Sequence, residues 1–533
     1  MSTATKTSAP ALPTTAGARR DWPAALAGVL AVATALGVSE LLAGLLPGAT
    51  SLVAAVGQVV IDLQPPGAKD VVVSLFGTND KLALELLIVV VALLIGAGLG
   101  LLARRHYAIA AATFVVFGVA GFVASLGDPL ADASMVAIST ALSVGVGLWV
   151  LGMLVDGSGG GVTVAATGTN TRAAQMPDWS RRSFLIRSSA VGVGAFAAGI
   201  VGRNLIESGR TAPVGDGPAV PPASVTVPPL TPEADLSTTV GGLTPIVMPS
   251  DSFYRIDTAL LTPGVSTTGW TLRIHGLVDR ETVLTWEQLI ALPMIEQYVT
   301  IACVSNEVGG KLVGNAKWTG VRLRDVLDIA GVQSAATQLV ARSSVSNFTA
   351  GMPTAWVMDP AREPMIAFKM NDEALPRIHG YPARLIVPGL FGYVSATKWL
   401  TDLELTTLEG FDGYWVPLGW AKEGPILTQS RIDTPRGGVA AGQVAIAGIA
   451  WAPDRGISKV EVAIDGVWRD ARRSAPISDA TWVQWVTDWA ADPGNHEIKV
   501  RATDGTGAVQ DEQPSPPAPD GARGWHTIMV NVG

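Results

Sequence analysis

The 533-residue chain contains a single cysteine, Cys303, within the stretch TIACVSNEVGG at residues 300–310. A cysteine thiolate is a strong ligand for metals that favour soft sulfur donors, and a loop with neighbouring backbone N–H groups can support it. The other interpretation is an inert buried cysteine behind the apolar residues 299–302. A lone thiol excludes an intrachain disulfide, a Cys-rich zinc site, an all-cysteine iron–sulfur cluster and a C-x-x-C-H haem attachment.

Four further motifs accompany the cysteine motif in a fixed order. The five are SFYRIDT (252–258), TIACVSNEVGG (300–310), VGNAKWTGVRL (313–323), LPRIHGYPARLIVPG (375–389) and GYVSATKWL (392–400). Together they resemble the sulfite oxidase family of molybdenum enzymes, including its membrane-anchored actinobacterial-type members. The resemblance extends to the C-terminus, because residues 448–466 (GIAWAPDRGISKVEVAIDG) are similar to the Ig-like dimerisation domain of that family.

The resemblance implies a cofactor, molybdenum carried by one molybdopterin, with Cys303 as the protein's ligand to the metal. It also implies that Tyr254 and Arg255 line the site, so that Cys303, Tyr254 and Arg255 are the expected catalytic residues. Molybdopterin carries a phosphate and a hydrogen-bonding pterin edge, which need cations and polar groups around them. The expected cofactor-binding residues are Cys303, Arg255, His379, Arg384, Ser395 and Lys398. A satisfied core histidine and ion-paired or solvated cations are the alternative interpretations.

The implied reaction is a two-electron oxygen-atom transfer on a small-molecule substrate. In sulfite oxidases proper, an arginine follows the cysteine by five positions and helps to bind the dianion. Val308 occupies that position here, and Glu307 adds negative charge beside it. Loss of a guanidinium that could clamp an oxyanion weakens the case for sulfite. Oxidation of a small sulfur compound and reduction of an S- or N-oxide both stay open, with Tyr254 and Glu307 as hypotheses for substrate contact.

The N-terminal composition predicts membrane spans that carry this domain. Hydrophobic residues make up 48% of the chain, charged residues 15%, and the mean hydropathy is +0.36. Four apolar runs are long enough to cross a bilayer of about 30 Å, at residues 24–46, 82–102, 108–126 and 135–155. The net charge of −8 argues against a nucleic-acid partner.

Arginines predict the direction of the spans. Arg19 and Arg20, Arg104 and Arg105, and Arg172, Arg181 and Arg182 all fall on one side if the N-terminus is cytoplasmic. Residues 180–185 (SRRSFL) resemble a twin-arginine export signal in an internal position. Their arginines can equally anchor a fifth span. Either interpretation predicts a multi-pass protein of the cytoplasmic membrane with its catalytic domain on the extracytoplasmic side.

The expected fold is multi-domain. It comprises an N-terminal α-helical transmembrane bundle, an α+β sulfite-oxidase-like molybdopterin-binding domain and a C-terminal Ig-like β-sandwich. Residues 211–250, rich in Pro, Ser and Thr, predict a semi-extended linker. The predicted boundaries are 1–160 for four spans, 161–210 for the twin-arginine-like segment and fifth span, 211–250 for the linker, 251–430 for the catalytic domain and 431–533 for the sandwich.

The residues available for electron transfer determine the expected partners. Of five histidines only His106 lies near the spans, so a bis-histidine haem is not expected. Electrons must therefore pass to or from an external redox partner or a quinone. The lipid bilayer and a second copy of the chain, paired through the C-terminal domain, are further expected partners. The competing hypothesis is a non-catalytic, membrane-displayed binding or sensing module with a degenerate sulfite-oxidase-like domain.

Overall fold

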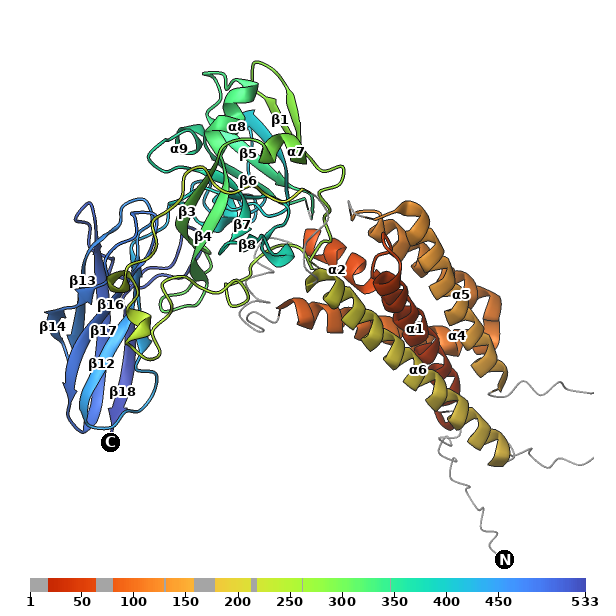
Figure 1. Cartoon of the computed structure of the whole chain (residues 1–533). Helices are drawn as coiled ribbons and strands as arrows, with labels where there is room; N and C mark the ends of the chain where they lie inside the picture. Colours follow the sequence, from red (N-terminus) through yellow and green to blue (C-terminus); the bar gives the residue numbers. More distant parts are fainter. Residues whose placement is uncertain are drawn as a thin grey trace, which may run out of the picture. The chain divides into compact units, whose positions relative to one another are not determined.

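The computed structural model describes residues 18–63, 80–128, 131–157, 178–211, 218–260, 262–345 and 347–533. The described residues up to 209 form one compact unit, which is helical, and those from 218 onward form a second, which is rich in β-strands (Figure 1).

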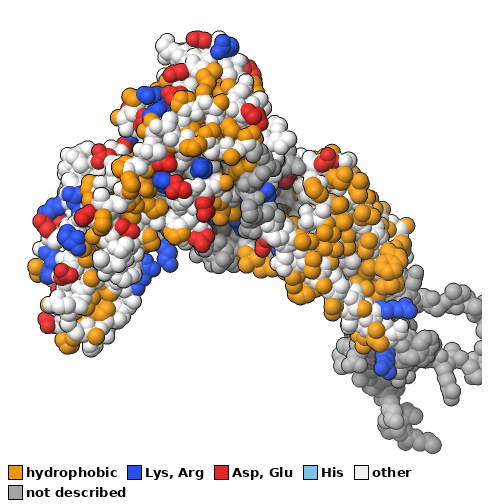
Figure 2. Space-filling view, viewed as in Figure 1, with side chains coloured by type: hydrophobic (Ala, Val, Ile, Leu, Met, Phe, Trp, Pro, Cys, Tyr) orange, Lys and Arg blue, Asp and Glu red, His pale blue; other side chains and the backbone are white. Residues whose placement is uncertain are grey.

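The helical unit contains four helices that are long and apolar enough to cross a membrane. Its helices are α1 (Ala18–Leu45), α2 (Leu52–Asp62), α4 (Asp80–Ser125), α5 (Ala133–Gly157) and α6 (Asp178–Thr211). The four candidate spans lie in α1, α4, α5 and α6. Figure 2 shows hydrophobic side chains over much of the visible surface of this unit, and Leu94, Val193 and Phe196 are each about 70% exposed. An exposed apolar surface of this kind is what hydrocarbon would cover.

Helix α4 contains both the second and the third predicted span. It runs for 46 residues, and only His106 departs from helical geometry, with φ −139° and ψ 68°. Leu99 and Phe114, on opposite sides of His106, belong to the same buried cluster. Val91 and Phe117 line one apolar cavity, although 26 residues of straight helix would separate them by about 39 Å. The chain therefore bends sharply at His106, between the two predicted runs.

Small residues allow the helices to approach closely. Gly28 of α1 faces Gly96 and Gly100 of α4, and a methyl group at Gly28 would overlap the Gly96 carbonyl oxygen. Such contacts between small residues are a common means of helix association in membranes. Helix α6, which includes the twin-arginine-like segment, is joined to α4 by an ion pair of 3.1 Å between Arg203 and Glu85.

The first part of the β-rich unit contains two sheets. One has the order β2-β1-β10-β5-β6; the other has the order β3-β4-β7-β8, with β9 paired to β7. The strands are β1 (Thr271–Gly276), β2 (Thr282–Thr285), β3 (Met294–Ala302), β4 (Val313–Arg322), β5 (Gln338–Ser343), β6 (Thr349–Pro353), β7 (Met365–Met370), β8 (Glu373–Ala374), β9 (Arg384–Ile386) and β10 (Leu400–Thr406). The helices are α7 (Trp286–Ile290), α8 (Leu323–Ala330), α9 (Thr354–Val357) and α10 (Gly392–Ser395).

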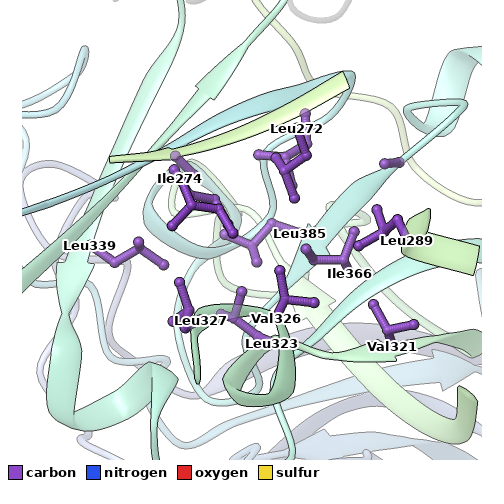
Figure 3. Close-up of a cluster of buried hydrophobic side chains, with 14 of the residues drawn as sticks. Leu272, Ile274, Leu289, Val321, Leu323, Val326, Leu327, Leu339, Ile366 and Leu385 are labelled. Atoms are coloured by element: carbon purple, nitrogen blue, oxygen red, sulfur yellow. The ribbon is translucent and has the colours of Figure 1, made fainter. Parts of the chain in front are cut away.

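Helix α8 connects the cores of these two sheets. Leu323, Val326, Leu327 and Ala330 follow helical spacing and are buried, and Gly331 ends the helix at φ +74°. Figure 3 shows the α8 side chains converging with those of β1, β5 and β9 in one cluster. Helix α8 is therefore stabilised because its apolar side fills the space between the sheets.

The C-terminal part contains two four-stranded sheets with a shared core. Their orders are β11-β12-β16-β15 and β14-β13-β17-β18. The strands are β11 (Gln429–Thr434), β12 (Gly442–Trp451), β13 (Ile457–Ile464), β14 (Val467–Asp470), β15 (Arg472–Arg473), β16 (Val483–Ala491), β17 (Gly494–Asp504) and β18 (His526–Val532). Ile446, Val462, Trp485 and Val500, from four different strands, are fully buried in one cluster. Assignment of these sheets to the Ig-like class stays a prediction.

The Pro-rich segment differs from the predicted tether. Its described residues, 218–250, pack along both parts of the β-rich unit. Val225 bridges to Ile295 of β3, Leu236 and Leu243 are buried with Val486 of β16, and Ile246 is 1% exposed. Isolated apolar residues among prolines carry no periodicity, so composition alone indicated a linker although these side chains are buried.

Candidate active site

A cavity of about 820 Å³, measured with its open mouth, lies in the β-rich unit beside Cys303. Its lining divides by exposure into two regions. The inner wall, defined here as Cys303, Arg384 and Lys398, is buried, with no member more than 8% exposed. The outer wall, defined as Phe348, Tyr393, Trp415 and Trp420, is only partly buried. Tyr254, also partly buried, lines the same cavity.

Cys303 is held at the first residue after β3. Its N–H donates to the Leu312 carbonyl at 2.9 Å, and its own carbonyl accepts from the Asn306 N–H at 3.1 Å. The Asn306 side-chain oxygen accepts from the Leu312 N–H at 2.8 Å, which closes the loop between β3 and β4. Because β3 and β4 pair along their whole length, the position of the thiol is fixed by the sheet.

Lys398 is a buried amine that donates two hydrogen bonds. Its Nζ donates to Asp257 Oδ2 and to the Ile378 carbonyl, each at 3.0 Å. Asp257 also accepts from Arg255 Nε at 3.0 Å. The pKa of Lys398 is lowered to about 8, mainly by burial and also by the charge of Arg384. The Asp257 carboxylate acts in the opposite direction and raises the pKa. The pKa of Lys398 still lies above neutrality, so the amine is mainly protonated at pH 7.

Arg384 is a buried guanidinium on β9 with an unsatisfied donor. One terminal nitrogen donates to the His379 carbonyl at 3.2 Å, and the guanidinium lies 5.3 Å from the centre of the Trp318 ring. Its Nε has no hydrogen-bond partner among the described residues. Burial lowers the pKa of Arg384 to about 10, which leaves it cationic at neutral pH. A buried donor without a partner costs about 1–3 kcal/mol, so this atom fits a ligand group.

His379 lies behind the cavity lining and is fully buried. Its Nε2 lies 2.7 Å from the Ser250 carbonyl oxygen and must donate to it, while Nδ1 has no partner among the described atoms. Burial, with the charges of Lys398 and Arg384, lowers the pKa of His379 to about 3. The neutral ring therefore offers Nδ1 as an unused buried acceptor.

Tyr254 keeps its phenol proton. Burial raises the pKa of Tyr254 far above its ordinary value, and a thiolate at Cys303 raises it further. Its ring stacks on Phe253, with centroids 5.3 Å apart. A protonated hydroxyl near the thiol is a hydrogen-bond donor available to a bound molecule.

The cavity does not include every residue expected there. Arg255 is exposed and reaches the site only through Asp257. Ser395 is buried outside the lining, and its hydroxyl donates to the Leu390 and Phe391 carbonyls at 2.9 and 3.0 Å. Glu307 is exposed and does not line the cavity.

Sequence analysis missed Asp257, Trp415 and Trp420, which line the cavity. Asp257 ends the first motif, so its place beside Tyr254 and Arg255 was a signal for it. No motif named here includes the two tryptophans, which are brought in by the fold.

The donor set fits molybdopterin better than a metal held by the chain alone. Across the described parts of the chain, no group of three or more His, Cys, Asp and Glu side chains could hold a metal ion. One thiol together with the Lys398 amine and the unsatisfied Arg384 Nε instead fits a cofactor that brings most of its own metal ligands and carries anionic and polar groups.

Residues 259–415 match the family model described as the oxidoreductase molybdopterin binding domain. Human mitochondrial sulfite oxidase is 29% identical over 304 residues, covering 47% of this chain and 55% of that protein. Arabidopsis thaliana sulfite oxidase is 25% identical over 351 residues, covering 54% and 88%. The sulfane dehydrogenase SoxCD structure from Paracoccus pantotrophus aligns with 26% identity and a TM-score of 0.47, covering 54% and 82%.

The family-model match and the curated relatives identify a molybdopterin-binding oxidoreductase domain in this region, and the donor set fits its cofactor, molybdenum bound by molybdopterin. This domain is similar to that of the sulfite oxidase family. It spans a little over half the length of the first mammalian relatives, at 55% and 59%.

Proposed function

We propose that this protein is a membrane-anchored, extracytoplasmic enzyme that transfers an oxygen atom to or from a small sulfur compound, S-oxide or N-oxide. The observation that carries the proposal is the placement of the only cysteine beside buried polar groups with unsatisfied hydrogen-bonding atoms. A non-catalytic display module would have no use for a buried guanidinium such as Arg384, whose unsatisfied Nε reduces stability unless a ligand engages it.

Each residue of the inner wall has a separate role in this proposal. The Cys303 thiolate binds molybdenum, which supplies a two-electron redox couple and an oxygen-transfer centre when bound. Arg384 and Lys398 bind anionic and polar parts of the cofactor, and His379, behind the lining, positions Arg384 by accepting its hydrogen bond at the main-chain carbonyl. Tyr254 donates its phenol proton in a hydrogen bond to the substrate.

The predicted site residues outside the cavity act indirectly. Arg255 holds Asp257, and Asp257 in turn orients the Lys398 ammonium through bonds of 3.0 Å. The Ser395 hydroxyl bonds two carbonyls before α10, which positions the turn that leads to Lys398. Both are positioning residues in this scheme.

The helical unit serves as the membrane anchor. Its arginines favour a cytoplasmic N-terminus and an extracytoplasmic catalytic domain. Electrons are exchanged with an external redox protein or a quinone. The C-terminal sheets form an Ig-like domain that pairs two copies of the chain. The domain boundaries near residues 160, 210 and 430 belong to the same proposal.

Metal analysis of the whole chain tests the proposal. The protein is purified in detergent from cells that supply molybdopterin, and molybdenum and pterin are measured per chain. We expect near-stoichiometric molybdenum, at least a tenfold lower content in Cys303→Ser, and unchanged content in the exposed control Ser458→Ala. Folded protein without molybdenum or pterin would contradict the proposed function and favour the display module.

A further inference from the structure

The outer wall is built from chain segments that are far apart in sequence. Phe348 precedes β6, Tyr393 lies on α10, and the two tryptophans lie in the loop after β10. The rings of Tyr393 and Trp420 are 6.3 Å apart and inclined by 50°. The cavity mouth therefore presents several aromatic faces to a substrate.

Backbone hydrogen bonds hold the tryptophan loop in place. Trp420 N–H donates to the Trp415 carbonyl at 3.2 Å, and Ala421 N–H donates to the Pro519 carbonyl at 3.0 Å. The Tyr393 hydroxyl donates to the Ala421 carbonyl at 2.6 Å. Tyr414 N–H donates to the Thr349 carbonyl at 3.0 Å, so the segment is anchored beside both tryptophans. The aromatic surface is therefore organised before a ligand arrives, which limits the entropy cost of binding.

The charges of the inner wall are already committed. Lys398 is paired with Asp257, and the Arg384 guanidinium, which already donates one bond to the His379 carbonyl, is occupied by the cofactor in the proposed function. A dianion would need a cation of its own, and the described lining offers no third Lys or Arg. A cationic ligand would meet the positive charges of Arg384 and Lys398. An uncharged substrate avoids both costs.

We infer that the aromatic outer wall selects an uncharged organic sulfur compound with an apolar substituent, and that the enzyme interconverts such a sulfide and its sulfoxide. This inference rests on the proposed function. The apolar substituent lies against Trp415 and Trp420, and the polarisable sulfur adds favourable contact with aromatic rings. The sulfoxide oxygen faces inward and accepts a hydrogen bond from Tyr254.

The reaction balances with an external electron carrier. In the reductive direction the sulfur–oxygen bond breaks, sulfur gains two electrons from the carrier, and the oxygen takes up two protons and leaves as water. In the oxidative direction water supplies the oxygen, and the same two electrons and two protons are released.

Substrate selectivity of the molybdenum-loaded full chain tests the inference. With reduced methyl viologen as donor, kcat/KM is measured for methyl phenyl sulfoxide and for dimethyl sulfoxide, which has no ring. Sulfite oxidation is measured with an oxidised dye. We expect methyl phenyl sulfoxide to be favoured by about tenfold or more over dimethyl sulfoxide, and sulfite to be the poorest of the three.

Variants separate the aromatic wall from the catalytic centre. Trp415→Leu and Trp420→Leu are expected to lower kcat/KM for methyl phenyl sulfoxide by about tenfold and to change the value for dimethyl sulfoxide by less than about twofold. The control is Trp468→Leu, because Trp468 is also partly buried but lies on β14, away from the cavity. Calorimetry with methyl phenyl sulfide compares the same variants with the original protein by their dissociation constants, without turnover.

The outcomes distinguish the two proposals. Absence of molybdenum contradicts the proposed function. Molybdenum-loaded protein that prefers sulfite, that fails to bind methyl phenyl sulfide, or that keeps its selectivity in both cavity variants overturns the inference and leaves the proposed function standing. A preference for an N-oxide of equal size over the sulfoxide also overturns it, since sulfur would then contribute nothing.

Discussion

The inner and outer walls of one cavity are built on opposite physical principles. The inner wall buries a thiol, a guanidinium and an ammonium, and it leaves Arg384 Nε without a partner. The outer wall presents aromatic rings whose polar atoms and backbone are largely held by the fold, as the Tyr393 hydroxyl shows. The inner wall thus has an unsatisfied hydrogen-bond donor when no ligand is bound. The outer wall has its polar groups largely satisfied and presents an aromatic surface.

This difference shows how one pocket can hold two molecules by separate means. Unsatisfied buried donors recognise a permanent polar cofactor, because its binding recovers free energy that the apoprotein lacks. Preformed aromatic faces recognise a transient substrate, because they lose little on its departure. An inner-wall substitution should therefore spare the stability of the apoprotein but weaken cofactor binding. An outer-wall substitution should remove contacts that the apoprotein already makes and weaken substrate binding.

The largest expected effect follows from removing the inner-wall guanidinium. Arg384→Met should lower molybdopterin content by at least about tenfold, since a charged hydrogen bond contributes about 1.5–3 kcal/mol. It should leave the apoprotein within about 1 kcal/mol of the original stability, because the unsatisfied Nε–H is lost with the charge. Pterin content and urea unfolding of the apoprotein measure the two effects.

A second arginine provides the matched control. Arg362 stacks on Trp356 at 3.6 Å, as Arg384 stacks on Trp318, but its NH1 bonds Asp454 at 2.7 Å and it does not line the cavity. Arg362→Met should destabilise the apoprotein and leave cofactor content unchanged. If both variants destabilise the apoprotein equally, Arg384 is an ordinary structural arginine.

The next effect concerns acid stability of the apoprotein. The pKa of His379 is near 3 in the folded state and 6.5 as its ordinary value, so between these values the unfolded state binds more protons. Folding stability therefore rises with pH through this window and falls on acidification. Between pH 7 and pH 4.5, His379 should account for about 2–3 kcal/mol of the stability lost.

His379→Gln tests this expectation, since glutamine does not titrate. Urea unfolding of both apoproteins at pH 7 and pH 4.5 should show a smaller acid loss in the variant by that amount. An equal loss in both proteins would mean that the ring is already charged or accessible when folded, which would remove Nδ1 as a buried acceptor.

The sequence could predict the inner wall better than the outer wall. Motif order brought Tyr254, Cys303, Arg384 and Lys398 together, and the structure places them at one cavity. These residues were named because their motifs resemble those of a known family, and each lies in or beside a strand or turn of its own motif. Trp415 and Trp420 reach the cavity through long-range contacts such as that between Ala421 and Pro519, which no local pattern encodes.

Fold prediction succeeded and failed for related reasons. Helix α8 was predictable because its buried residues recur at helical spacing, and this spacing is a direct consequence of burying one face. The Pro-rich segment was interpreted as a linker because Leu236, Leu243 and Ile246 are isolated and aperiodic. Their burial depends on contacts with side chains of β12, β16 and neighbouring loops, which the segment itself does not specify.

A smaller effect is expected at Ser395, which the motifs assigned to the cofactor. Its hydroxyl bonds two main-chain carbonyls, so Ser395→Ala should cost about 1 kcal/mol in the free energy of unfolding. Cofactor content should stay at the original level. A large loss of pterin with unchanged apoprotein stability would instead place this hydroxyl in the inner wall.

The smallest effect is expected at Arg255, the exposed member of the predicted site. Its ion pair with Asp257 is partly solvated, and such pairs contribute about 0–1 kcal/mol. Arg255→Ala should therefore lower kcat by no more than about threefold, through weaker positioning of Lys398 by Asp257. If the role is positional, Arg255→Lys should recover the lost rate, and added salt should reduce the rate of the original protein toward that of the alanine variant. A loss of a hundredfold or more, unchanged by salt and not recovered by lysine, would mean that Arg255 enters the cavity and contacts the reacting molecule.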